Sequence, residues 1–422
     1  MATAAIPDEK LAQAGQSEPA QETTCCVVGG GPGGMMLALL LARRGIDVTV
    51  LEAHKDFDRE FRGDTIHPSI LEILDQIGLA EPLLKLRHNK IYGPTFQSSG
   101  GAFSPIDFRR LKTRFPYIML VPQTKFLEFL AAEAKKYPNF KLRMVANVGQ
   151  LIEGENGVQG VRYQSTEGWH EVRARLTVGA DGRFSKVRQL AGLVPLKTSP
   201  PMDILWFQLP HMPEDAHSDR VMGGFGGGRM LAVFDRIDYW QIGYVFPKGH
   251  YQDVRAAGLE AFRKSIVEIE PNFARHVESL TDWHQCSLLS VESSRCPVWY
   301  KPGLLLIGDA AHVMSPVGGV GINYAVQDAV VAVNVLARPL SQGQVRVEDL
   351  AEVQCQREWP TRIIQRIQST LQTRIIASGL QVQGTLEIPW FVRLFFKVPA
   401  LRNIPARILG FGLKRVRLQE TS

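Results

Sequence analysis

The chain has 422 residues, a formal net charge of +6, 45% hydrophobic residues and 21% charged residues. This length exceeds what one hydrophobic core usually supports, and the composition excludes a mainly disordered or fibrous protein. Five cysteines follow no zinc-like or C-x-x-C spacing, so we expect free thiols in a reducing compartment, no metal ligands and a cytoplasmic location. Residues 1–23 are polar, carry no apolar run of signal-peptide length and are predicted to form a disordered tail.

The excess positive charge lies in the C-terminal tail. From residue 390 to 422, seven basic residues stand against one acidic residue, and they alternate with Phe, Leu and Ile. Such a mixture suits a helix packed on the protein, which we favour, or peripheral contact with an anionic membrane surface. No apolar stretch is long enough to span a bilayer. The bases are interleaved with aliphatic residues, which argues against nucleic acid as a partner.

The predicted elements begin with a strand at residues 24–28, a glycine cluster, a helix at 35–44 that Gly45 ends, and a β-branched strand at 46–51. This order predicts a βαβ unit with a right-handed crossover. Pro68 is expected to open a helix that runs toward Gly78. Apolar periodicity predicts further helices at 124–136, 323–336 and 362–376, and strands at 140–148, 158–163, 171–178, 204–209, 239–246 and 304–307. The helix at 362–376 is expected to bury one face, formed by Ile363, Ile364, Ile367, Leu371 and Ile375.

The glycine cluster fits G-x-G-x-x-G between the first strand and the first helix. Gly29 permits a tight turn, Gly31 lets the backbone approach a pyrophosphate at the helix N-terminus, and Gly34 allows helix and strand to pack closely. Glu52 ends the next strand, where it can accept hydrogen bonds from a ribose hydroxyl. Strand, helix, strand and acid in this order predict a dinucleotide-binding fold.

Three segments together resemble the para-hydroxybenzoate hydroxylase family, the class A FAD-dependent aromatic monooxygenases. The first is the glycine cluster. The second, residues 178–188, is similar to the family's Asp-Gly segment, in which Asp181 and Gly182 would touch the pyrophosphate. The third, residues 308–323, is similar to the segment that holds the ribityl chain and the flavin ring, with Asp309, Pro316, Gly319, Gly321 and Asn323. The resemblance also implies that Arg62 lies near the cofactor and that Gln123 contacts the flavin's phosphate or ribityl side.

The third segment also has a reading from its residues alone. Asp309 follows a buried strand, where it can accept a hydrogen bond from a sugar-alcohol hydroxyl. Gly318, Gly319 and Gly321 let the backbone lie against a flat ring, and free N–H groups before the helix at Asn323 can stabilise negative charge on reduced flavin. His312 is expected to pack and hydrogen-bond locally rather than to act as a base.

Residues 223–228 are also rich in glycine, but Arg229 stands where a second fingerprint would need glycine. We therefore predict a hairpin turn at this position. The chain offers a single dinucleotide fingerprint, so NAD(P)H is expected to bind transiently without a Rossmann domain of its own.

The resemblance implies an α/β fold: a Rossmann-like (GR2-type) FAD-binding domain, a second β-sheet substrate domain and a C-terminal helical segment. We assign residues 24–90, 115–200 and 297–345 to the discontinuous FAD-binding domain. Residues 91–114 and 201–296 form the expected substrate domain, and residues 346–422 the C-terminal helical region.

The resemblance further implies that NAD(P)H reduces FAD, that reduced flavin and O2 form a C4a-hydroperoxide, and that its distal oxygen hydroxylates the substrate. Aromatic-rich strands indicate an apolar aromatic substrate that is phenolic, polycyclic or quinone-like. Candidate wall residues lie on strands whose side chains alternate, so about half of them can face the site: Trp206, Phe225, Phe234, Trp240 and Tyr244. No catalytic acid or base is predicted. Two alternatives stay open: a flavin-dependent reductase of prenyl chains, and a flavin-free lipid-binding module on the same fold.

Overall fold

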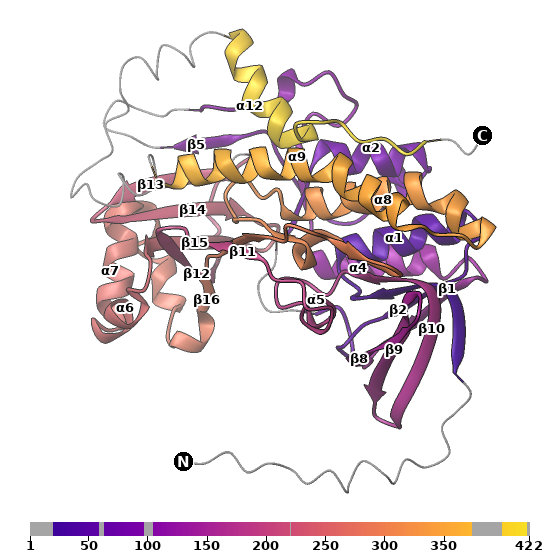
Figure 1. Ribbon diagram of the computed structural model, residues 1–422. Coiled ribbons are helices and arrows are strands. Elements are labelled where there is room, and N and C mark those ends of the chain that lie inside the picture. The colour runs from indigo at the N-terminus through magenta and orange to yellow at the C-terminus, as the bar shows by residue number, and fades with distance from the viewer. Residues whose placement is uncertain (1–19, 59–62, 97–103, 220, 374–398, 420–422) are drawn as a thin grey trace, which may run out of the picture.

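The computed structural model describes residues 20–58, 63–96, 104–219, 221–373 and 399–419 (Figure 1). The largest sheet has the strand order β18-β19-β10-β1-β2-β7, and β9 and β8 extend it from β10. The contacts of β1 with β2 and β10, of β2 with β7, and of β10 with β19 are parallel. Its strands are β1 (Gln21–Val28), β2 (Val48–Leu51), β7 (Phe140–Arg143), β8 (Asn147–Gly154), β9 (Gly157–Ser165), β10 (Gly168–Gly179), β18 (Tyr300–Lys301) and β19 (Leu304–Leu306).

The helices α1 (Pro32–Arg43) and α8 (Gly321–Gln342) pack together in the main core beside this sheet. Helix α1 begins with a proline at its first turn, and Gly45 follows its end at a φ of +74°, as expected for a glycine C-terminal signal. A Cβ on Gly33 would lie 3.1 Å from the carbonyl oxygen of Ala325 in α8, so the glycine permits close helix packing. Four shorter helices complete this part: α2 (Pro68–Gln76), α3 (Ala80–Leu84), α4 (Gln123–Ala134) and α5 (Lys186–Leu190).

A second sheet has the order β16-β12-β15-β14-β13-β5. Its outermost strand β5 comes from the segment 91–114, which precedes the other strands of this sheet in the chain, and pairs in parallel with β13. One face is buried against α7 (Leu259–Ile269), near the short helix α6 (Tyr251–Ala256). The predicted hairpin turn is confirmed, because Gly227 and Gly228 adopt positive φ between β13 and β14. The strands are β5 (Pro94–Phe96), β12 (Met202–Pro210), β13 (Val221–Gly226), β14 (Arg229–Asp235), β15 (Tyr239–Pro247) and β16 (Ser287–Ser290).

Two small three-stranded sheets join these parts, with the orders β11-β17-β20 and β3-β6-β4. Their strands are β3 (Thr65–Ile66), β4 (Asn89–Ile91), β6 (Ile118–Leu120), β11 (Leu196–Thr198), β17 (Ser293–Arg295) and β20 (His312–Val313). The mixed α/β architecture with two main sheets agrees with the fold class expected from the sequence.

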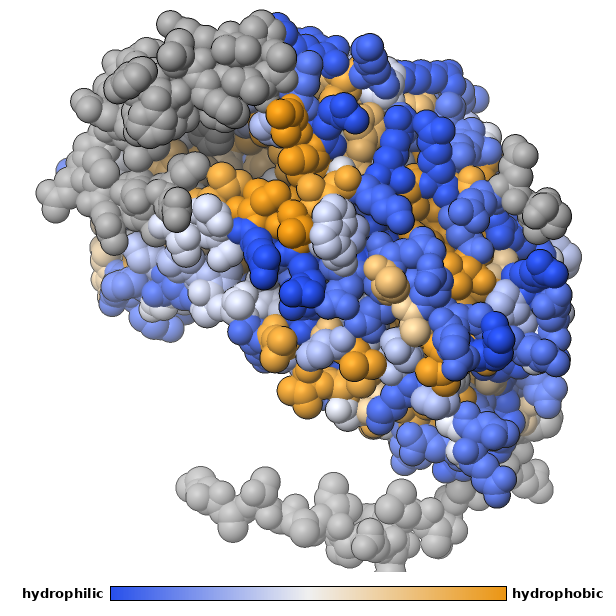
Figure 2. All heavy atoms as spheres, turned by 45° about the horizontal axis from the view of Figure 1, so that its top comes forward, coloured by the Kyte–Doolittle hydropathy of each residue, from blue (hydrophilic) through white to orange (hydrophobic). Residues whose placement is uncertain are grey.

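The C-terminal helices α9 (Val347–Leu371) and α12 (Pro399–Phe411) lie across the top of the molecule in Figure 1. The tail after α12 packs on the body: Leu418 exchanges hydrogen bonds with Gln76, and Arg415 forms an ion pair with Glu72. In Figure 2, which brings this side forward, apolar side chains gather between hydrophilic ones. Residues 390–398 of the basic tail lie outside the described residues. Among the residues that the structure describes, no helix is long and apolar enough to cross a membrane.

Three local predictions were wrong. Strand β1 begins at Gln21, three residues before the predicted start. The strand predicted at residues 140–148 is divided between β7 and β8, with a break at residues 144–146. Helix α9 is longer than expected, and its buried face is half polar rather than an isoleucine stripe. Ile364 is buried, but Ile363 and Ile367 are half-buried and Leu371 is exposed, while Ile375 lies outside the described residues. Four of the eight buried residues of α9 are polar. Of these, Gln354 and Gln368 bond to loops and Arg357 bonds to Asp328 of α8.

Candidate functional site

The three segments of the predicted cofactor site meet at one edge of the large sheet. Gly29 N donates to Leu51 O (2.8 Å), Ala180 N donates to Val28 O (2.7 Å), and Ile307 N donates to Gly179 O (3.0 Å). These bonds bring together the carboxyl ends of β1, β2, β10 and β19. In open α/β sheets, ligands bind outside the carboxyl ends of the strands. The glycine cluster, Glu52, Asp181 and Asp309 therefore surround one location.

The three glycines of the fingerprint have different surroundings. Gly29 has a φ of +107°, and a Cβ there would lie 2.5 Å from Ala180 O. A Cβ on Gly34 would lie 2.1 Å from Gly29 O, so neither position admits a side chain without movement of the backbone. At Gly31 the nearest atom to such a Cβ is 4.0 Å away. Gly29 and Gly34 thus serve packing, whereas Gly31 keeps the space in front of α1 open.

Glu52 fastens the end of β2 to the glycine turn. Its side chain is buried and accepts hydrogen bonds from Gly30 N (2.8 Å) and from His54 N (3.0 Å), and it pairs with His54 Nδ1 (2.7 Å). The carboxylate is therefore held rigidly beside the N-terminus of α1, at the position predicted for a ribose contact.

The Asp-Gly segment is held by its own loop. Asp181 accepts hydrogen bonds from Ser185 Oγ (2.5 Å) and Val187 N (3.0 Å), and burial raises the pKa of its carboxyl. Gly182 has a φ of +81° with open space around it. Arg188, which the sequence did not single out, donates to Ala310 O (3.0 Å) and so ties this segment to the third one. The side chain of Asp181 thus orders the loop, and its contact with pyrophosphate stays a prediction.

A buried ionic group supports the third segment from behind. Asp328 of α8 accepts hydrogen bonds from Gly308 N (2.9 Å) and Arg357 Nε (2.7 Å), and it pairs with His312 Nε2 (2.6 Å). Burial alone would raise the pKa of Asp328, but the charges of His312 and Arg357 hold it below its usual range. His312 is buried within this group, as its expected local role requires. Asp309 is half-buried at the end of β19.

The loop from Pro316 to Gly321 is fixed on both sides. Thr65 Oγ1 donates to Gly319 O (3.0 Å), and Gln368 of α9 donates to Val317 O (2.7 Å). Gly319 has a φ of +62°, and a Cβ at Gly321 would meet nothing within 4 Å. Hydrogen bonds from other parts of the protein therefore fix the loop, and open space remains at Gly321, where α8 begins.

A buried polar group beside this loop lacks a partner among the described residues. Asn323 accepts a hydrogen bond from Ser69 Oγ, but its Nδ2 has no acceptor. The neighbouring His67 donates through Nδ1 to Leu409 O (2.7 Å), has the backbone of Gly319 as a second hydrogen-bond neighbour, and burial lowers its pKa to about 4. Leaving a buried donor unpaired costs about 1–3 kcal/mol, so Asn323 Nδ2 fits a ligand that supplies an acceptor.

Gln123 begins α4, and its backbone N donates to Asp64 Oδ1 (3.0 Å). Asp64 forms a largely buried ion pair with Arg236, whose Nε donates to Gln241 Oε1 (2.9 Å). Gln241 lies on β15 and Arg236 in the turn between β14 and β15, so this group joins the second sheet to the part of the protein that holds Asp64. Sequence reasoning missed Arg236, since nothing near it in the chain marks a site. Arg62 lies outside the described residues.

The residues present fit FAD. Neither α1 nor α8 has a side-chain cap or an acidic residue in its described first turn, so both N-termini offer backbone N–H groups to an anion. Open space lies at Gly31, Gly182 and Gly321, and the unpaired Nδ2 of Asn323 lies two residues after Gly321. A pyrophosphate at α1 and a flavin ring before α8 would use both features.

The predicted aromatic wall divides between two faces of the second sheet. Trp206 and Phe234 lie together, with ring centroids 6.0 Å apart, and Trp206 packs on the same buried cluster as Met230 and Val317. Trp240 and Tyr244 lie on the opposite face, in the core against α7. Phe225 is half-buried opposite Met230. Val317 belongs to the Pro316–Gly321 loop, which we call the flavin-side loop. The face of the sheet that carries Trp206 and Phe234 is therefore the one turned toward the site.

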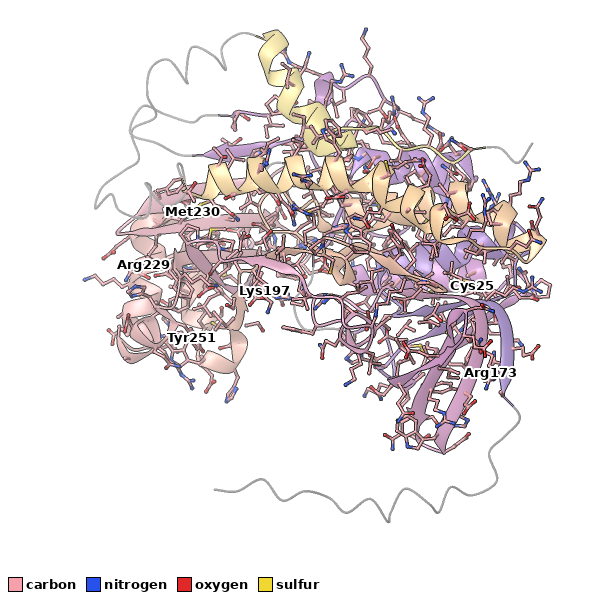
Figure 3. All side chains as sticks on the ribbon, viewed as in Figure 1. Cys25, Arg173, Lys197, Arg229, Met230 and Tyr251 are labelled. Carbon is pink, nitrogen blue, oxygen red and sulfur yellow. The ribbon has the colours of Figure 1, made fainter. Side chains whose placement is uncertain are left out.

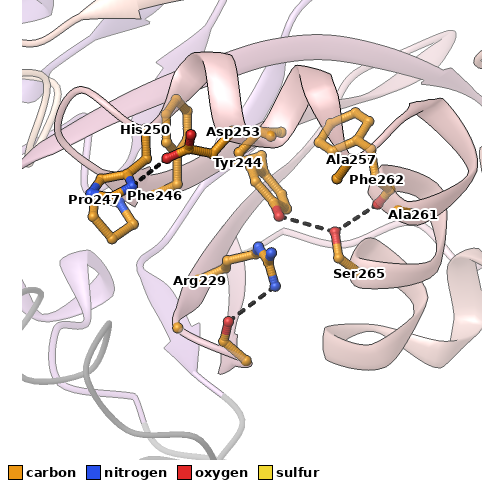
Figure 4. A pocket seen from close by; sticks show the side chains of 13 residues that line it. Arg229, Tyr244, Phe246, Pro247, His250, Asp253, Ala257, Ala261, Phe262 and Ser265 are labelled. Atoms are coloured by element: carbon orange, nitrogen blue, oxygen red, sulfur yellow. Dashed lines mark hydrogen bonds and ion pairs between the residues drawn. The ribbon is translucent and has the colours of Figure 1, made fainter.

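A cavity of about 330 Å³ lies on the α7 side of this sheet (Figure 4). Tyr244 lines it and its hydroxyl pairs with Ser265 Oγ (3.0 Å). Arg229 also lines it, whereas Met230, the next residue on β14, belongs to the opposite face (Figure 3). None of the predicted cofactor residues lines this cavity.

Comparisons with known proteins show the family of the chain. Residues 22–362 match the family described as an FAD binding domain. The chain is 33% identical over 383 residues to 6-methylpretetramide 4-monooxygenase from Streptomyces rimosus, covering 90% of each chain. Among solved structures it resembles the anhydrotetracycline hydroxylase OxyS from Streptomyces rimosus, with a TM-score of 0.73 and 25% identity over 95% of this chain and 78% of that one.

The probable FAD-dependent monooxygenase PqsL from Pseudomonas aeruginosa shares the fold, with a TM-score of 0.73 and 20% identity over 86% of this chain and 100% of that one. The family match extends over the three converging segments. The chain therefore belongs to the class A FAD-dependent aromatic monooxygenases.

Proposed function

We propose that this enzyme uses NAD(P)H and O2 to hydroxylate a polycyclic phenolic substrate bound between the flavin-side loop and the second sheet. The observation that carries the proposal is the site-turned face of that sheet, where Trp206 and Met230 pack on the same cluster as Val317 and Phe234 lies against Trp206. Such an aromatic and aliphatic surface suits fused rings better than a small charged acid. The similarity over 90% of a relative named for 6-methylpretetramide supports the same substrate class.

In this proposal, bound FAD supplies the oxygen chemistry, and the chain supplies position and shelter. Gly31 and the N-terminus of α1 hold the pyrophosphate, Glu52 the ribose, Asp309 the ribityl chain, and Gly321 with Asn323 the flavin ring. The Pro316–Gly321 loop and the second sheet exclude water and hold the acceptor carbon near the ring. Excluding water matters because a reactive oxygen species exposed to solvent is lost as hydrogen peroxide.

The test is a panel of aromatic compounds assayed for NAD(P)H oxidation, with hydrogen peroxide and hydroxylated product measured in the same reactions. We expect polycyclic phenols to stimulate NADPH or NADH oxidation with product formation matching reductant use. Stimulation by small benzoates and not by larger phenols would contradict the proposed substrate class.

The same assay separates the alternatives. A reductase of prenyl chains would consume reductant without taking up oxygen, and a flavin-free lipid-binding module would purify colourless and gain no flavin absorbance with added FAD. The relative that covers 90% of this chain is named as a monooxygenase, which favours the first function over both alternatives.

A cytoplasmic location and a peripheral membrane contact through the basic tail also stay predictions. Packing of Arg415 and Leu418 on α2 supports the alternative in which the tail covers the protein. Sedimentation with anionic vesicles, compared with neutral vesicles, tests the membrane contact.

A further inference from the structure

Two histidines and a carboxylate meet at one corner of the second sheet, away from the proposed cofactor site. His211 and His217 lie in the connection between β12 and β13, and Asp235 ends β14. His217 Nδ1 lies 3.2 Å from Asp235 Oδ2, and His211 Nε2 lies 3.3 Å from Asp235 Oδ1. One ligand atom from each of the three residues falls within 4.8 Å of the others. We call these three residues the His–His–Asp cluster.

These separations are longer than those of four other histidine–carboxylate pairs in the described residues. His54–Glu52 and His250–Asp253 are 2.7 Å apart, His312–Asp328 2.6 Å and His276–Asp215 2.9 Å, as charge-assisted hydrogen bonds usually are. The pairs His211–Asp215 and His284–Asp282 are longer still, at 3.7 and 3.9 Å. Metal–nitrogen and metal–oxygen bonds of about 2.0–2.1 Å in a tetrahedron place neighbouring ligand atoms roughly 3.3 Å apart. Both histidine–carboxylate separations of the cluster are close to this value, and its three ligand atoms lie within 4.8 Å of one another.

The surroundings of the cluster hold its ligands in place. Asp235 is fully buried, and Ser218 N donates to its Oδ2 (2.5 Å). The second ring nitrogen of His211, Nδ1, lies 3.7 Å from Asp215 Oδ2, and Asp215 is itself fixed by Trp240 Nε1 (2.7 Å). Ligating histidines usually have their other nitrogen near such a carboxylate, which orients the ring.

An entry path is also present. The carbonyl oxygen of Arg236 accepts a hydrogen bond from His211 Nε2 (3.1 Å), and a metal ion bound at Nε2 would replace this hydrogen bond. The side chain of His217 is 72% exposed, so an ion can reach the cluster from solvent.

We propose that the His–His–Asp cluster binds one divalent metal ion of the zinc type through His211 Nε2, His217 Nδ1 and the Asp235 carboxylate. Imidazole and carboxylate together suit Zn²⁺ and its first-row neighbours. The role of the ion is structural, because it would clamp the β12–β13 connection to the end of β14. Arg236 follows Asp235 directly and pairs with Asp64, so the clamp stiffens the junction between the two parts of the protein.

The test uses the untagged, FAD-loaded protein, freed of metal by a chelator and titrated calorimetrically with ZnCl2 alone. We expect one saturable equivalent per chain. His217→Ala should weaken this binding at least tenfold, the effect usually seen when metal-site residues are lost. Since His217 is mostly exposed, this variant should fold, and Co²⁺ added to the wild type should give the visible absorption of a tetrahedral site.

His284→Ala is the matched control. His284 is 97% exposed and lies 3.9 Å from Asp282, so it is a surface histidine beside an acid but outside the cluster. This variant, and Cys355→Ser at the exposed thiol, should bind Zn²⁺ like the wild type. Equal Zn²⁺ affinity in His217→Ala and the wild type, or no saturable binding in the wild type, would overturn the proposal. Because the readout is metal binding, it stands or fails independently of the monooxygenase reaction.

Discussion

The substitution Gly31→Val separates cofactor binding from folding. A Cβ at Gly31 has no neighbour closer than 4.0 Å, and the residue has a φ of −73°, so valine fits the backbone. Its methyl groups would fill the space before α1 and block backbone N–H groups from a phosphate. Two such charge-assisted hydrogen bonds are worth about 3 kcal/mol or more in total, so the Kd for FAD should rise at least roughly 100-fold.

The assay is titration of the apoprotein with FAD, followed by flavin fluorescence, together with thermal unfolding of the apoprotein. Unfolding is measured without FAD because a bound ligand itself raises the apparent stability. Gly34→Val is the contrasting variant: its Cβ would meet Gly29 O at 2.1 Å, so it should lower the unfolding temperature directly. A folded Gly31→Val protein that binds FAD within threefold of the wild type would refute the placement of the pyrophosphate.

Three further predictions concern groups around the site. Burial lowers the pKa of His67 to about 4, so the folded state keeps it neutral while the unfolded chain takes up a proton below pH 6.5. Stability should therefore fall by about 3 kcal/mol between pH 6.5 and 4 through this group, and denaturant unfolding of His67→Gln should lack that component. Arg236→Met leaves Asp64 buried without its ion-pair partner, so it should lower the free energy of unfolding by about 3–5 kcal/mol, measured with denaturant. Adding Asp64→Asn should regain part of this loss, whereas strict additivity of the two changes would argue against a coupled pair. Trp206→Ala should raise KM for polycyclic phenols roughly tenfold, whereas Tyr244→Phe on the α7 face should leave it unchanged, and equal effects of the two would contradict the assignment of faces.

Local patterns in the chain predicted the strand–turn–helix geometry around the glycine fingerprint. The glycine fingerprint and the strands beside it depend on turn geometry and on period-two or helical periodicity, which are encoded within short segments. Gly29, Gly34 and Gly45 each occupy the tight or positive-φ position expected of them. The convergence of three distant segments followed from the parallel sheet, because such a sheet places the carboxyl ends of its strands along one edge.

Features that depend on contacts between distant segments were not predictable in this way. Because side chains alternate along a strand, about half of the predicted aromatic residues were expected to face the site. Which half does so depends on the face against which α7 packs. The polar face of α9 is buried because Gln368 and Arg357 meet loops and charges far away in sequence. The residues of the His–His–Asp cluster come from a loop and from the end of a later strand, so no local sequence spacing predicted the cluster.

The parallel pairing of β5 with β13 has a consequence for how the protein can be divided. The second sheet takes its outermost strand from residues that precede most of the first sheet in the chain. A fragment cut at residues 201–296 would expose the bare edge of β13 and invite pairing with other chains. A graft of this sheet onto another scaffold must therefore include residues 94–96. Proteolysis within the segment 91–114 should destabilise the sheet, although its other strands lie far downstream in the chain.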